Sequence, residues 1–157
     1  MQHTSLRTAV IRTFLLALVS MCLFTFAARA GGDSYEITLN NKVLIRQALY
    51  EPFDLKNLDL SEAKATDKIY IRFLQCNEPG KVGKSRAISI RDTKGNIVKE
   101  WKFQDSDQKG NAMVISVGEL LALQKNAADR LVVYYSAKGY EQPQKLAALM
   151  PRRNGRT

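Results

Sequence analysis

Cys76, which is followed closely by basic residues, is the group in the chain best suited to covalent chemistry. Positive charge near a thiol favours the thiolate, which is the form that attacks substrates and disulfides. A lone cysteine is more often a small buried apolar residue, so the sequence leaves two interpretations open, a reactive thiol and a core residue. The segment is also rich in loop-forming residues, and its candidate contact residues are Cys76, Asn77, Lys81, Lys84 and Arg86.

Two motifs resemble ligand-binding loops but lack residues that those loops need. Gly83-Lys84-Ser85 matches the end of a phosphate-binding loop, yet Glu78 stands where its first glycine belongs. The segment 105–110 starts like a calcium loop, but Lys109 occupies a position that requires an oxygen ligand and Ser116 replaces the bidentate glutamate. The sequence therefore predicts neither a nucleotide site nor a calcium site, and no cofactor is expected.

The first 30 residues have the three parts of a secretory signal peptide. Arg7 and Arg12 provide a basic start, residues 14–28 are almost entirely apolar, and Ala28-Arg29-Ala30 is the small-x-small pattern of a cleavage site. The apolar run of about 15 residues is shorter than the roughly 20 needed to span a bilayer core. We therefore expect cleavage after Ala30, export, and no transmembrane anchor in the mature chain.

Removal of this segment would leave the protein without histidine and with one cysteine. His3 is the only histidine, and Cys22 also lies before the predicted cleavage site. Nucleophilic sites that pair serine or cysteine with histidine, and histidine-ligated metal sites, are then excluded. Cys76 would have no partner for an intramolecular disulfide. No catalytic residue or metal ligand is predicted, and the expected protein is not an enzyme.

The charge of the mature chain is only mildly basic. The whole sequence has 24 basic and 15 acidic residues. The signal would remove three basic residues and no acidic ones, leaving 21 against 15, and Arg152, Arg153 and Arg156 belong to an expected basic, flexible tail over 151–157. This balance is not that of a nucleic-acid-binding protein. It is compatible with weak, salt-sensitive attraction to anionic glycans or lipid headgroups.

Short alternating apolar segments between turn residues predict a mostly β fold for residues 31–150. The turn at Asn40-Asn41 joins the first two segments, and the loop from Asp92 to Gly95 predicts a bulged hairpin with Gly95 in the left-handed conformation. Segment 145–150 is compatible with a strand or a short helix. The predicted strands are 35–39, 43–45, 53–60, 69–74, 86–91, 97–103, 113–117, 131–135 and, as the undecided one, 145–150.

One short helix is predicted after residue 116. Ser116 and Glu119 match a capping box, Leu120, Leu121 and Leu123 supply an apolar stripe, and Asn126 suits the helix end. In the strand over 97–103, alternation places Ile97, Trp101 and Phe103 on one face. The pattern favours an antiparallel β-sandwich of seven to nine short strands with one short helix, as a single domain.

Three stretches carry a resemblance to known proteins. They are Tyr35-Glu36-Ile37 with Leu39 to Lys42, Gln75 to Asn77 with Pro79 to Lys81, and the alternating run from Arg86 to Phe103. Over roughly residues 34–150 the chain resembles small exported proteins of Gram-negative bacteria that have no established function. The resemblance implies an envelope or secreted location and no activity, cofactor or catalytic residue.

These features favour an exported, non-catalytic binding or structural module of the bacterial envelope, located in the periplasm, on the cell surface or outside the cell. Its expected contact surface is an exposed strand edge, which can accept a partner strand, or the loop around residues 77–86. The expected partner is another envelope protein or an anionic glycan. Two alternatives remain, a thiol-dependent enzyme or redox protein that uses Cys76, and an accessory protein that binds anionic glycans or lipids weakly.

Overall fold

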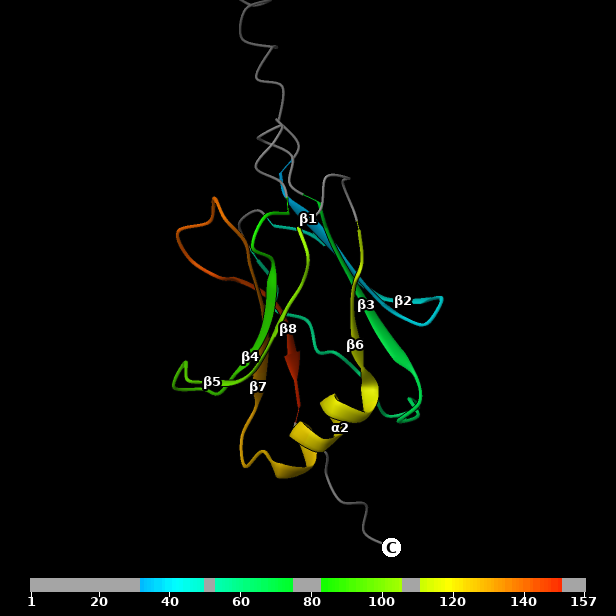
Figure 1. Ribbon diagram of the computed structural model, residues 1–157. Coiled ribbons are helices and arrows are strands. Elements are labelled where there is room, and N and C mark those ends of the chain that lie inside the picture. The colour runs from blue at the N-terminus through cyan, green and yellow to red at the C-terminus, as the bar shows by residue number, and fades with distance from the viewer. Residues whose placement is uncertain (1–31, 50–52, 75–82, 106–110, 151–157) are drawn as a thin grey trace, which may run out of the picture. The chain divides into compact units, whose positions relative to one another are not determined.

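The protein is described by a computed structural model over residues 32–49, 53–74, 83–105 and 111–150. The chain divides into two units between Ala30 and Gly31, and all the described residues belong to the second unit. They contain eight strands in two four-stranded antiparallel sheets and one helix (Figure 1). The predicted mostly-β sandwich is therefore confirmed, with a strand count inside the predicted range.

The first sheet has the spatial order β2-β1-β3-β6. Its strands are β2 (Lys42–Ala48), β1 (Ser34–Leu39), β3 (Lys68–Leu74) and β6 (Met113–Ser116). Asn40 turns the chain between β1 and β2 with a φ of 50°, as the Asn-Asn turn predicted. Its side chain also receives the main-chain N–H of Lys68 at 3.0 Å, which holds this turn against the start of β3.

The second sheet has the spatial order β5-β4-β7-β8. Its strands are β5 (Ile97–Lys102), β4 (Ala87–Arg91), β7 (Leu131–Ser136) and β8 (Gln144–Leu149). The last segment is thus a strand, which settles the choice between strand and helix that its sequence left open. β7 lies between β4 and β8, as expected for a segment whose residues are apolar on both faces.

The two sheets face each other across an apolar core. Ile37 and Ile71 from the first sheet and Ile88 and Ile90 from the second are all almost completely buried. The Tyr35 hydroxyl also donates to the main-chain carbonyl oxygen of Leu146 on β8, so a polar contact joins the sheets inside the core. Burial raises the pKa of Tyr35 to about 12, and the nearby negative charge of Asp54 adds to that effect.

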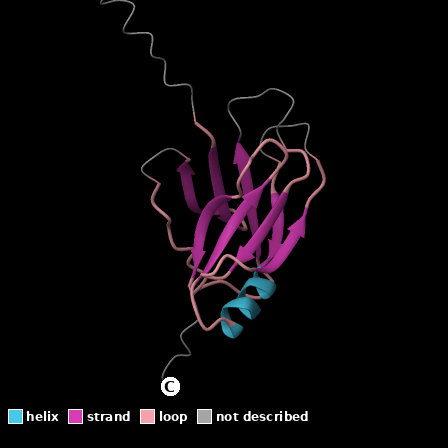
Figure 2. Ribbon diagram, turned by 90° about the vertical axis from the view of Figure 1, so that its left-hand side faces the viewer, coloured by secondary structure: helices cyan, strands magenta, loops and turns pink. Residues whose placement is uncertain are grey.

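The helix α2 (Val117–Asn126) follows β6 directly and lies across one end of the sandwich (Figures 1 and 2). Its bounds agree with the prediction, but its cap does not, because the Ser116 side chain makes no capping hydrogen bond. The first-turn N–H groups of Val117 and Gly118 donate instead to the main-chain oxygens of Asp67 and Ala65, at 3.0 and 3.1 Å. A neighbouring loop thus satisfies the first two free amides of the helix without a side-chain cap.

The predicted strand over 53–60 is wrong. Only Asn57 forms a bridge there, a parallel one to Ala148 of β8. The main-chain N–H of Leu58 donates to the Ala148 oxygen, and the Ala148 N–H donates to the Lys56 oxygen. Leu58 and Leu60 are nevertheless buried, so the apolar pattern reports burial rather than regular pairing. The segment covers the outer edge of β8.

Candidate functional site

The edge strand β5 is exposed on both of its faces. Five of its six residues are exposed and Trp101 is half-buried, whereas all five residues of the neighbouring β4 are buried or partly buried. The exposed side chains include two large apolar ones, Ile97 at 53% and Val98 at 47% of their full accessible area. No described segment pairs with the outer side of β5. The strand thus combines free main-chain groups with apolar surface.

The register shows which main-chain groups of β5 are free. The Phe103 N–H donates to the Arg86 oxygen, and the pairs that follow include Ile88 with Trp101 and Ile90 with Lys99. In an antiparallel ladder, every second residue directs its N–H and C=O to the partner strand and the others direct them away. Lys99 and Trp101 therefore bond toward β4.

Glu100 and Lys102 occupy the alternate positions, opposite Ser89 and Ala87. Their main-chain N–H and C=O groups point away from β4, along the free edge. Their side chains share the outer face of the sheet, where the Lys102 Nζ lies 3.9 Å from the Glu100 Oε1. The free edge therefore presents two donors and two acceptors between one acidic and one basic side chain.

A register shift near the hairpin corrects the predicted face of Ile97. Arg91 pairs with Ile97 although Ile90 pairs with Lys99, so Val98 is the additional residue of a bulge. Ile97 consequently lies on the face of Arg91, opposite to that of Trp101. The alternation used for the prediction assumed an uninterrupted strand, and one extra residue reverses the face.

Trp101 and Lys99 meet the first turn of α2 on the core-facing side of β5. The indole N–H of Trp101 donates to the Glu119 Oε2 at 3.2 Å. The Lys99 Nζ lies 3.6 Å from the Glu119 Oε1 and 5.7 Å from the centre of the Trp101 ring. Glu119 is therefore bound to β5 and does not reach back to Ser116, which explains why no capping box forms.

A pocket of about 350 Å³ continues this interface toward the hairpin loop. Val98 and Leu123 contribute apolar walls, and Asp92, Lys94 and Asp129 line its rim. Leu123 lies one turn after Glu119 on the helix, and Val98 precedes Lys99 on the strand. The pocket and the contacts among Lys99, Trp101 and Glu119 therefore lie along the same interface between β5 and α2.

At this pocket, the carboxylate of Asp92 serves the loop itself. The Asp92 carboxylate accepts the N–H groups of Lys94 and Asn96 and the side-chain amide of Asn96, each at 2.9 Å. These bonds, that of the Asn96 side chain foremost, lower the pKa of Asp92. Gly95 has a φ of 88°, as predicted for the bulged loop. Within the described residues no group of three metal-ligating side chains occurs.

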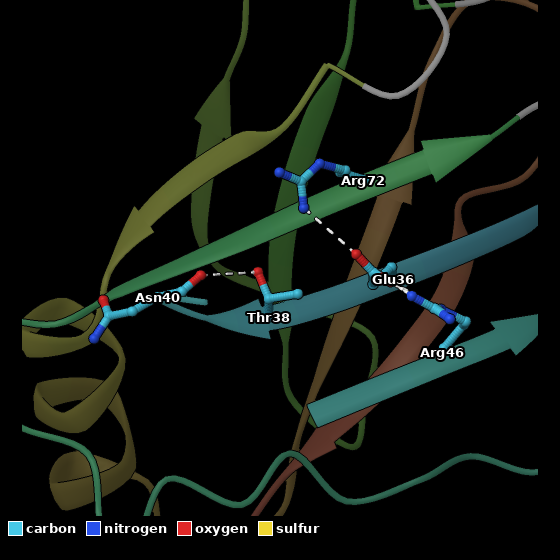
Figure 3. A network of polar contacts seen from close by, with 5 residues as sticks. All are labelled: Glu36, Thr38, Asn40, Arg46 and Arg72. Atoms are coloured by element: carbon cyan, nitrogen blue, oxygen red, sulfur yellow. Dashed lines mark hydrogen bonds and ion pairs between the residues drawn. The ribbon is translucent and has the colours of Figure 1, made fainter. Parts of the chain in front are cut away.

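The outer face of the first sheet carries a second polar cluster, shown in Figure 3. The Glu36 carboxylate on β1 binds Arg46 of β2, whose Nε donates at 2.8 Å, and lies 3.4 Å from the Arg72 Nη1 of β3. In the next row, Thr38 donates to the main-chain oxygen of Asn40 at 3.3 Å. One carboxylate thus bridges two arginines on the neighbouring strands and links β1, β2 and β3 across this face.

The structure describes two of the five predicted contact residues, and they differ in exposure. Cys76, Asn77 and Lys81 lie outside the described residues. Lys84 is exposed in a turn, but Arg86 is only 8% exposed. The Arg86 guanidinium donates twice to the Gln104 oxygen, at 2.8 and 3.1 Å, and once to the Asn111 oxygen at 2.9 Å. Arg86 therefore holds the chain after β5 and is not displayed to a partner.

The sequence did not point to the pairing of Trp101 with Glu119. The two residues are 18 positions apart, on elements that meet only in the folded chain. The one available signal was the composition of segment 97–102, which sets Lys99, Glu100 and Lys102 among apolar residues. Interspersed charges are typical of a strand at the edge of a sheet.

The described residues contain no helix that is both long and apolar enough to cross a bilayer. Comparison of the chain with protein-family models, curated proteins and solved structures gives no match.

Proposed function

We propose that the protein is an exported, non-catalytic binding module that takes up an extended segment of another envelope polypeptide as an additional strand beside β5. The observation that carries this proposal is the edge of β5, where Glu100 and Lys102 present main-chain donors and acceptors that no other described segment uses. Strand addition uses such groups for affinity and the flanking side chains for specificity.

The opposite end of the same sheet does not offer this surface. Residues 56–58 already bond to Ala148 along the outer side of β8. As far as the described part of the chain goes, an incoming strand therefore finds its open edge in this sheet at β5, which carries the exposed Ile97 and Val98. Apolar side chains beside an open ladder strengthen strand addition because the added segment buries them.

The side chains of β5 also define what kind of segment fits. On the outer face, Glu100 favours a basic residue and Lys102 an acidic residue directly opposite. On the other face, Trp101 favours an apolar or aromatic neighbour. The expected ligand is thus an extended segment that alternates charged with apolar residues.

Export is the second part of the proposal. It is supported by the signal-like pattern of residues 1–30. N-terminal sequencing of the protein recovered from a bacterial periplasmic extract should begin at Gly31. Recovery of the intact N-terminus from that extract would refute cleavage.

The substitution Glu100→Pro tests strand addition. A phage library of short random peptides is selected on the mature chain, and enriched peptides are assayed against Glu100→Pro and Glu100→Gln. Proline removes the outward N–H, and an edge position tolerates it because the bonds to β4 come from other residues. We expect peptide binding to be lost with Glu100→Pro and retained with Glu100→Gln.

A second substitution guards against local misfolding. Lys102→Pro removes the other outward donor and should weaken the same peptides, while circular dichroism and thermal unfolding verify that both proline variants keep the β-sheet fold. Equal peptide binding by folded Glu100→Pro and by the unaltered chain would refute the proposal, as would a selection that enriches no peptide.

A further inference from the structure

We infer that the segment that fits the free edge of β5 best is β5 of a second copy, so that the protein forms a two-fold symmetric dimer with one continuous eight-stranded sheet. The inference rests on the proposed function, because it uses the same edge and names its partner. It follows from the order of charges along β5 and from the contacts of residues 56–58 at β8, the opposite edge of the same sheet.

Symmetry limits the number of registers. Two copies of β5 can bond along their edges only if outward-directed residues meet outward-directed residues, and these are Glu100 and Lys102. An antiparallel two-fold pair can then be centred on Glu100, on Trp101 or on Lys102. Each centre places a different residue of the partner subunit opposite Glu100.

The charges of Glu100 and Lys102 favour one of these three registers. A centre at Glu100 sets two carboxylates opposite each other, and a centre at Lys102 does the same with two ammonium groups. A centre at Trp101 sets Glu100 opposite Lys102 of the partner subunit, twice by symmetry. Because Lys102 already lies 3.9 Å from Glu100 within one chain, the four charges alternate in sign around the dimer axis.

The same register places the two Trp101 side chains opposite each other on the other face. Each remains held by its own Glu119 at 3.2 Å, so the aromatic surface is ordered before the copies meet. Directly opposite aromatic residues at a non-bonded position of the ladder lie close enough to pack. Four outward main-chain donors, two from each copy, also gain acceptors.

The assembly closes at two copies. After pairing through β5, the two ends of the continuous sheet are the two β8 strands, and residues 56–58 of each chain cover them. The main-chain groups of Ala148 at each end are therefore already bonded, and a two-fold contact uses the same surface on both copies. The expected product is a dimer rather than a filament.

Charge reversal with mixing tests the inference. The mature chain should sediment as a dimer in analytical ultracentrifugation at concentrations up to about 1 mM, the range of weak strand–strand association. Glu100→Lys alone and Lys102→Glu alone place like charges opposite each other, and each should weaken dimerisation by about tenfold or more. An equimolar mixture of the two variants restores opposite charges at both positions, so heterodimers should form.

Lys145→Glu makes the same charge change on β8, at the covered end of the same sheet, and should leave dimerisation unchanged. A mature chain that is monomeric at every concentration overturns the inference. A dimer that both single variants retain, or a mixture that fails to associate when the unaltered chain does, overturns the register. If the chain is monomeric while Glu100→Pro still abolishes binding of selected peptides, the inference fails and the proposed function stands.

Discussion

The indole N–H of Trp101 and the carboxylate of Glu119 join an edge strand to the first turn of the helix at 3.2 Å. This bond explains two features together. It prevents Glu119 from capping its own helix, and it fixes an aromatic side chain at the edge where a partner strand would add. Glu119, which does not cap its own helix, instead orders Trp101 at the proposed binding surface.

The strength of this contact can be measured with a double-mutant cycle. Trp101→Phe removes the indole donor, Glu119→Ala removes the acceptor, and the double variant lacks both groups. We expect a coupling of about 0.5–1.5 kcal/mol in the free energy of unfolding by urea, the usual range for one hydrogen bond of this kind. A coupling of zero would mean that the contact does not persist in solution.

The buried Arg86 should be among the most sensitive charged positions. Arg86→Leu removes a buried guanidinium and leaves the main-chain oxygens of Gln104 and Asn111, two exposed residues, without that donor. We expect a loss of about 1.5–3 kcal/mol in the free energy of unfolding, because three hydrogen bonds from a charged, buried side chain are lost. Arg86→Lys should recover only part of it, since an ammonium group cannot reproduce the three-bond geometry of the guanidinium.

Lys84→Ala is the matched control for Arg86. Lys84 is exposed two positions earlier, so its removal should change the free energy of unfolding by no more than about 0.5 kcal/mol. Similar values for the two positions would argue that Arg86 is not buried as described. Comparison of the two substitutions also shows which of these two predicted contact residues has a structural role. The sequence alone does not distinguish them.

Stability should fall at alkaline pH because of two buried tyrosines. Burial raises the pKa of both Tyr35 and Tyr135 to about 12; at Tyr135 the positive charge of Arg86 opposes this effect and Asp33 adds to it. In the unfolded chain each phenol releases its proton near pH 10, so between about pH 10 and 12 the unfolded state binds fewer protons and stability declines. Below pH 10 these groups have no effect. The full loss is about 3 kcal/mol for each phenol.

Urea unfolding between pH 8 and 11.5 checks this expectation. Tyr35→Phe should remove about half of the alkaline decline, while Tyr134→Phe on the outer face leaves both buried phenols and the full decline in place. Tyr35→Phe also deprives the Leu146 oxygen of its donor, at a cost of about 1 kcal/mol at neutral pH. An alkaline decline that is the same in all three proteins would contradict the assignment.

Local turns were predictable because the residues that determine them are neighbours in sequence. Asp92 and Gly95 form the predicted loop, and Asn40 takes the predicted positive φ. Features that depend on distant segments were not predictable. The oxygens of Asp67 and Ala65 replace the helix cap, and Ala148 gives residues 56–58 a bridge instead of a strand pairing.

The candidate site illustrates the same division. Lys99, Glu100 and Lys102 stand among apolar residues along 97–102, a composition typical of an edge strand. The bulge at Val98 depends on how the five-residue loop closes against β4, and it reverses the face of Ile97. Which edge stays open depends on where residues 56–58 run, and no pattern near either strand encodes that.

Substitution of Gly95 isolates the conformational demand of the hairpin loop. Its φ is 88°, and a Cβ built there meets no atom within 4 Å, so the cost of Gly95→Ala is backbone strain alone. We expect about 1 kcal/mol of lost stability for alanine and a smaller loss for Gly95→Asn, since asparagine tolerates this conformation better. Equal losses for alanine and asparagine in thermal unfolding would point to a cause other than backbone conformation.

Hydrogen exchange along β5 tests the register on which both proposals depend. The amides of Lys99 and Trp101 point to β4 and should exchange slowly, whereas those of Glu100 and Lys102 point outward and should exchange quickly in dilute solution. Raising the concentration should slow Glu100 and Lys102 selectively, because pairing with a second copy gives those amides acceptors. The amide of Phe103, bonded to Arg86 at 2.8 Å, is the internal reference for a protected group. Uniform protection of all four amides in dilute solution would show that the edge of β5 is not open, and both proposals would then lose their basis.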